Sequence, residues 1–104
     1  MFTITVIPLY HYGAEAKTMM AAVRKADAII KRISRDIEVQ INVGTFDDGV
    51  PIMTIEKKGG RIRAFWCGST KEEPIKITDQ PPPSVVVTSE AISALDEISQ
   101  LFGF

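Results

Sequence analysis

The alternation of apolar and polar positions predicts two strands in the first half of the chain. Residues 3–9 alternate β-branched and apolar side chains and stop near Pro8, as expected of a strand. Residues 37–46 alternate in the same way and predict a second strand. A turn with a glycine to bend it and a proline to stiffen it follows at residues 47–51.

Between these strands, from residue 14 to about residue 34, the apolar period changes to about 3.6 residues. The apolar side chains then fall on one arc of a helix: Met19, Ala22, Val23, Ala26, Ile29, Ile30 and Ile33. Opposite this arc lies a basic stripe that consists of Lys17, Arg24, Lys31 and Arg35, with Lys25 and Arg32 beside it. The pattern predicts an amphipathic helix that covers one face of a sheet.

Residues 51–69 form two alternating runs around Gly59 and Gly60. Glycines at this point permit positive φ angles, so the pattern predicts a β-hairpin. In the second run, Phe65 and Trp66 fall on opposite faces of the strand, and one of these two rings therefore has to point away from the main core.

The last third of the chain predicts a connector, a brief strand and a second helix. Residues 74–84 are polar and rich in proline, which is typical of an extended spacer, with a possible edge strand at residues 75–77. Residues 84–88 form a short strand-like run. A helix that Ser89 can cap is then expected to extend to Phe102.

The predicted order is strand, helix, three strands, a possible short strand and a final helix. A helix between two strands of one sheet normally makes a right-handed, parallel crossover. We therefore expect a single α/β domain over residues 1–104, a two-layer α/β sandwich with a mixed sheet. A ferredoxin-like α+β arrangement is the alternative.

Composition indicates a soluble protein and the distribution of charge is uneven. The 104 residues are 45% apolar and include one cysteine, so no intramolecular disulfide can form and a cytoplasmic setting is expected. No apolar run approaches the roughly 20 residues that cross a bilayer. Residues 1–37 carry six basic and three acidic side chains, whereas the remaining residues carry six basic and ten acidic ones. Such a dipolar surface suits an anionic partner on one side, or self-association.

Residues 49–73 resemble the thioredoxin-like superfamily, in particular its compact selenoprotein W-like branch. The similarity lies in a proline before a strand, a glycine-containing turn, a returning strand and a later glycine. The resemblance implies that Pro51 matches the cis-proline beside the family's active site and that Gly68 matches the glycine that ends the hairpin. At the position of the family's Cys-x-x-Cys pair, this chain has Gly13 and Ala16. The resemblance therefore brings a thioredoxin-like fold without disulfide chemistry.

The first candidate site is a binding surface formed by two short segments. Tyr10, His11 and Tyr12 follow the first strand and precede the helix, where free backbone N–H groups favour anions. On the predicted fold they lie beside Val50 and Pro51. The alternative interpretation is that the three aromatic residues simply close one end of the core.

Two candidate chemistries are weaker. Cys67 is a reactive thiol only if a nearby cation lowers its pKa, and a free cysteine is more often a small buried hydrophobe. Asp48, Glu56 and Lys58 have a spacing that some metal-dependent nucleases use. Charged residues beside a hairpin turn are, however, normally just solvated. We expect no metal site and no cofactor, since one histidine and one cysteine make a poor ligand set.

The basic stripe of the helix is the most organised feature of the predicted surface. Its cations can follow a phosphate backbone, although no aromatic residue interleaves with them to stack bases. The leading hypothesis is a non-redox, thioredoxin-like interaction module that binds a protein partner or a second copy of itself and is not an enzyme. The alternatives are an oxidoreductase-type protein that uses Cys67 or a bound cofactor, and anion or nucleic-acid binding by the stripe.

Overall fold

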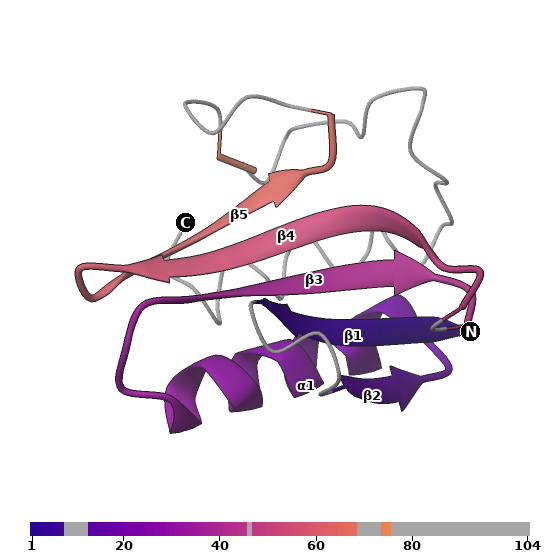
Figure 1. Cartoon of the computed structure of the whole chain (residues 1–104), viewed down its shortest axis with the longest axis horizontal. Helices are drawn as coiled ribbons and strands as arrows, with labels where there is room; N and C mark the ends of the chain where they lie inside the picture. The colour runs from indigo at the N-terminus through magenta and orange to yellow at the C-terminus, as the bar shows by residue number, and fades with distance from the viewer. Residues whose placement is uncertain (8–12, 46, 69–73, 76–104) are drawn as a thin grey trace.

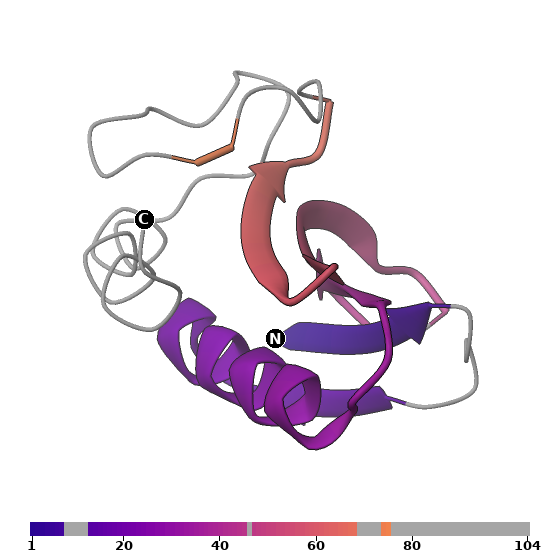
Figure 2. The ribbon, with the colours of Figure 1, turned by 90° about the vertical axis from the view of Figure 1, so that its left-hand side faces the viewer.

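The computed structural model describes residues 1–7, 13–45, 47–68 and 74–75, and within them a single helix packs on one face of a five-stranded sheet (Figure 1, Figure 2). Neighbouring strands are antiparallel throughout, in the order β2-β1-β3-β4-β5. In chain order the elements are β1 (Phe2–Ile7), β2 (Gly13–Ala16), α1 (Met19–Arg32), β3 (Ile37–Val43), β4 (Val50–Lys58) and β5 (Arg61–Trp66).

The predicted fold class is wrong. A thioredoxin-like sandwich requires the first strand to lead through the helix into a parallel strand, but β1 turns back into β2 and pairs with β3 in the antiparallel sense. The described residues therefore form an antiparallel sheet with one helix, not a mixed sheet in a two-layer α/β sandwich. The ferredoxin-like alternative fails at the same step, because its first strand also leads directly into the first helix.

The helical crossover does exist, but it starts from β2. Both β2 and β3 are antiparallel to β1, so they are parallel to each other, and α1 connects them across β1. The sequence Gly-Ala-Glu-Ala of β2 is poor in strand-forming residue types, and the pattern therefore placed the start of the helix here. The strand β2 is stabilised by its pairing with β1. The sequence of residues 13–16 alone does not reveal this pairing.

The helix begins at Met19 because Thr18 caps it. The Thr18 Oγ1 atom accepts a hydrogen bond from the Ala21 backbone N–H at 3.1 Å. Six of the seven predicted apolar positions are buried and Ile33 is half-buried, so the predicted core face of the helix is confirmed. At the other end, the Lys57 Nζ atom donates to the Ile33 carbonyl at 2.8 Å, which places a cation at the negative end of the helix dipole.

The core lies between α1 and one face of the sheet. Across the three central strands, Ile4, Ile41 and Met53 are paired side by side and each is 0% exposed. Trp66 belongs to this core, whereas Phe65 lies on the opposite face of β5. Trp66 is therefore the ring on the core face of the sheet, and Phe65 is the ring that points to the opposite face.

On β1 and β3 the second face of the sheet carries mostly polar side chains. The buried Asn42 donates through Nδ2 to the Thr3 carbonyl at 3.4 Å and to the Thr5 Oγ1 atom at 3.3 Å. A β-bulge interrupts the ladder between Ile41 and Asn42, opposite Pro51. A bulge suits proline, because proline has no N–H group to give to the ladder. The bulge thus accounts for a proline inside β4.

Each outer strand of the described sheet has a backbone group satisfied from outside the ladder. On the β2 side, the Lys25 Nζ atom donates to the Glu15 carbonyl. On the β5 side, the Ile75 N–H group donates to the Ala64 carbonyl at 2.8 Å. Sheet edges with open backbone groups invite pairing with another chain. At these two points the backbone carbonyls already accept hydrogen bonds within this chain, so they are not free to pair with another chain.

Several predicted elements lie outside the described residues. They are the strand at residues 84–88, the helix at residues 89–102, most of the connector at residues 74–84 and the end of the first predicted strand at residues 8–9. Among the residues that are described, no helix has the length and apolar character needed to cross a membrane.

Candidate functional site

The predicted binding surface of two segments is only partly visible. Tyr10, His11 and Tyr12 lie outside the described residues, so their role stays a prediction. Val50 and Pro51 are exposed at the start of β4.

The last described residue before Tyr10 lies far from Val50 along the sheet. Ile7, at the end of β1, pairs with Glu38 at one end of β3, whereas Val50 pairs with Val43 at the other end. Five residues of a strand span about 17 Å. The last described residue before the predicted loop therefore lies at the opposite end of the sheet from Val50.

Cys67 has the environment of a structural thiol. It is half-buried, and its Sγ atom lies 3.9 Å from the Thr54 hydroxyl oxygen. Burial raises the pKa of the thiol above its ordinary value, and the weaker contact with Thr54 only partly offsets this. A nucleophilic cysteine needs the opposite shift, since the thiolate is the reactive form. The structure thus gives no support to thiol chemistry at Cys67.

We expect Cys67 to react with iodoacetamide more slowly at pH 7.5 than the thiol of glutathione, because its raised pKa leaves less thiolate. The rate measured against pH should rise only at alkaline pH, and the urea-unfolded chain is the control. A raised thiol pKa also favours the folded state at neutral pH, and this contribution is lost as the pH rises through the folded-state pKa. A rate faster than that of glutathione would restore the oxidoreductase alternative.

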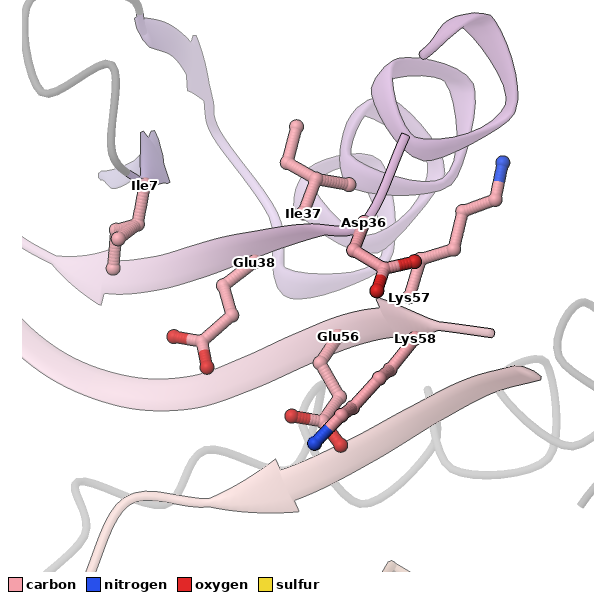
Figure 3. A pocket seen from close by; sticks show the side chains of 7 residues that line it. All are labelled: Ile7, Asp36, Ile37, Glu38, Glu56, Lys57 and Lys58. Atoms are coloured by element: carbon pink, nitrogen blue, oxygen red, sulfur yellow. The ribbon is translucent and has the colours of Figure 1, made fainter. Parts of the chain in front are cut away.

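A cavity of about 270 Å³ opens at the end of the sheet where β1 and β4 finish and β3 begins (Figure 3). Its lining consists of Ile7, Asp36, Ile37, Glu38, Glu56, Lys57 and Lys58. Glu38 and Glu56 lie directly opposite each other on β3 and β4, and Figure 3 shows both side chains on the same side of the sheet. Like charges in this arrangement destabilise a sheet unless a cation stands nearby.

The fold uses several of the polar groups around this cavity. Glu56 is buried and its Oε1 atom accepts a hydrogen bond from the Arg63 Nη2 atom at 2.7 Å. The Asp36 Oδ1 atom accepts from the Gly59 N–H group at 3.1 Å. Lys57 is turned away from the glutamates toward the carbonyls that end α1. These three groups hold strands and helix together at this end.

The nuclease-like pattern does not assemble. Asp48 precedes the start of β4, whereas Glu56 and Lys58 lie at its far end. A strand of that length separates them by roughly 20 Å or more. Within the described part of the chain, no three His, Cys, Asp or Glu side chains are grouped as a metal would need.

The basic stripe is exposed, as the pattern predicted. Lys17, Arg24, Lys31 and Arg35 all have exposed side chains, and so do the neighbouring Lys25 and Arg32. The helix is shorter than predicted, however, so Lys17 precedes α1 and Arg35 follows it.

The charges of α1 itself are strongly biased toward the positive sign. Its only acidic residue is Asp27, whose side chain is 10% exposed and whose Oδ2 atom lies 3.0 Å from the Lys31 Nζ atom. Lys31 itself remains 58% exposed. The solvent face of α1 therefore presents cations, and the one acidic residue of the helix is withdrawn from the surface. The exposed Glu15 and Asp36 lie just outside the two ends of the helix.

No protein-family model, curated protein sequence or solved structure matches this chain. Its function therefore has to be inferred from its own residues and their arrangement.

Proposed function

We propose that this protein is a binding module that holds a nucleic-acid duplex by its phosphate backbone, through the solvent face of α1. The observation that carries the proposal is the bias of charge on this helix. Four exposed cations lie on α1, two more, Lys17 and Arg35, flank it, and the single acidic residue of α1 is buried. Neutralisation of phosphates by such side chains releases counterions, and this release drives binding.

The composition of the surface favours nucleic acid over a protein partner. Among the described residues, only Met1 and Val50 are large, exposed hydrophobic side chains, and neither lies on α1. Protein interfaces are typically centred on aromatic residues and methionine and are depleted in lysine. Interfaces with nucleic acid are more polar and much more positively charged. The solvent face of α1 has the composition that is typical of a nucleic-acid interface.

The same composition favours a duplex over a single strand. Proteins that hold single strands stack the bases on exposed aromatic side chains. The described residues expose no aromatic side chain on α1. Contacts to the phosphates alone position a duplex without reading its sequence. We therefore expect binding that is independent of base sequence and sensitive to salt.

The test is the fluorescence anisotropy of a labelled 20-base-pair duplex, titrated with the full chain at 50 mM and 200 mM salt. If four phosphates are neutralised, the affinity should fall by about a hundredfold between the two salt concentrations. Arg35→Gln should weaken binding by about tenfold at 50 mM salt. It should also reduce the slope of log affinity against log salt by the amount expected for about one phosphate contact.

Val50→Glu is the matched control. It lowers the net charge by one, as Arg35→Gln does, but at an exposed position at the start of β4, which is not part of the basic stripe. It should change the affinity by less than twofold. The proposal is wrong if the wild-type chain does not bind the duplex at 50 mM salt, or if both variants weaken binding equally. Tighter binding of polyglutamate than of the duplex would instead support an acidic protein partner.

A further inference from the structure

The turn between β4 and β5 places more cations at the surface. Lys58 and Arg61 face each other across this turn and both side chains are exposed. Within the described residues, neither of them forms an ion pair. Between them, Gly59 and Gly60 adopt positive φ angles of 59° and 81°.

The tip of this turn is open. A Cβ atom added to either glycine would meet nothing within 4 Å. Because glycine has no side chain, a bulky ligand can approach the backbone here closely. A phosphate backbone that follows the tip therefore has access to both flanking cations.

Two contacts tie the turn to the end of α1. The Lys57 Nζ atom donates to the Ile33 carbonyl at 2.8 Å and lies 3.5 Å from the Ile30 carbonyl. The Gly59 N–H group donates to the Asp36 Oδ1 atom at 3.1 Å. Asp36 follows Arg35 directly in the chain. These contacts place the turn beside the basic end of the helix, and Figures 1 and 2 show both at the same end of the molecule.

Three carboxylates, Asp36, Glu38 and Glu56, also lie at this end of the sheet, and the exposed cations outnumber them. Asp36 is exposed, and its Oδ1 atom accepts a hydrogen bond from the Gly59 N–H group. Glu56, which precedes Lys57 in β4, is buried and forms an ion pair with Arg63. The exposed side chains at this end are therefore mainly cations: Lys31, Arg32, Arg35, Lys58 and Arg61.

We propose that the β4–β5 turn is a second phosphate-binding limb, in which Lys58 and Arg61 contact the same duplex that α1 holds. This inference rests on the proposed function of α1 and adds a second segment of the chain to its site. Two limbs from different elements fix the orientation of a duplex, which a single helix face does not. The partner remains a nucleic-acid duplex recognised by its phosphates.

The experiment compares two double variants with equal changes in charge in the same salt-dependent duplex titration. Lys58→Gln with Arg61→Gln removes the turn cations, and Arg32→Gln with Arg35→Gln removes two cations at and just after the C-terminal end of α1. Each pair should weaken binding by about a hundredfold at 50 mM salt and make the salt dependence shallower by about two phosphates. Lys58→Arg with Arg61→Lys keeps both charges and should bind within threefold of the wild-type chain. Thermal unfolding of each variant, followed by circular dichroism, should match that of the wild-type chain.

The outcomes separate the inference from the function on which it rests. If the turn variant binds as the wild-type chain does while the helix variant is weakened, the second limb is overturned and the proposed function stands. If the wild-type chain fails to bind, or neither variant is weakened, both are overturned. If the charge-conserving variant is weakened as much as the turn variant, charge at the turn is not the cause and the second limb is again overturned.

Discussion

Replacement of Ile41 by alanine is expected to lower the free energy of unfolding by about 3 kcal/mol, within the range measured for buried aliphatic side chains. Ile41 lies in the central strand of the sheet and is 0% exposed. Its neighbours across the sheet, Ile4 and Met53, are also 0% exposed. The deleted atoms would therefore leave a cavity that rigid neighbours on both sides cannot fill.

The matched control is Val43→Ala, on the same strand and the same face of the sheet. Val43 is half-buried at the end of β3, so the expected loss is about 1 kcal/mol. Urea unfolding at neutral pH, with both transitions fitted to two states, measures the difference between the two variants. Equal losses would mean that Ile41 does not occupy the centre of the core and that the strand order is incorrect.

The sequence predicted those parts of the fold that have a strong local period. The buried face of α1 and the hairpin around Gly59 and Gly60 both follow from side-chain spacing, and the structure contains both. The strand β2 could not be predicted in this way. Its four residues have little preference for a strand, and it forms because β1 offers backbone partners. Because this strand was not predicted, the sheet was expected to be mixed, whereas it is antiparallel.

The candidate site was predicted to a similar extent. The exposed cations of α1 follow from helical spacing alone, whereas the neighbouring turn does not. Lys58 and Arg61 lie more than 20 residues after Arg35 in the chain. The pairing of β3 with β4 and the side-chain contacts of Lys57 and Asp36 bring the two segments together. The available signal was the concentration of basic residues on both sides of the glycine pair, a pattern that is also typical of a solvated turn.

The second large effect is expected at Arg63, because it compensates a pair of glutamates. Glu38 and Glu56 lie opposite each other on β3 and β4, and Glu56 is only 5% exposed. Arg63 donates to Glu56 at 2.7 Å, and its guanidinium carbon lies 5.3 Å from the centre of the Phe65 ring. Loss of Arg63 thus removes a charge-assisted hydrogen bond and a cation–π contact together.

Arg63→Ala is expected to lower the free energy of unfolding by about 2 kcal/mol, which is less than the loss of one partner costs in a fully buried ion pair. The side chain of Arg63 is 37% exposed, so solvent already screens part of the interaction. Arg61→Ala is the control on the same strand and face. It should cost less than about 0.5 kcal/mol, as is usual for an exposed side chain.

A double-mutant cycle with Glu56→Gln separates the ion pair from the packing of Arg63. We expect a coupling energy of about 1 to 2 kcal/mol between the two positions, measured by urea unfolding at neutral pH. Once Glu56 is neutral, Glu38 no longer faces a like charge, so the remaining cost of Arg63→Ala should reflect its contact with Phe65. A coupling energy near zero would show that the sheet tolerates the two opposed glutamates without Arg63, and that the arginine acts through packing alone.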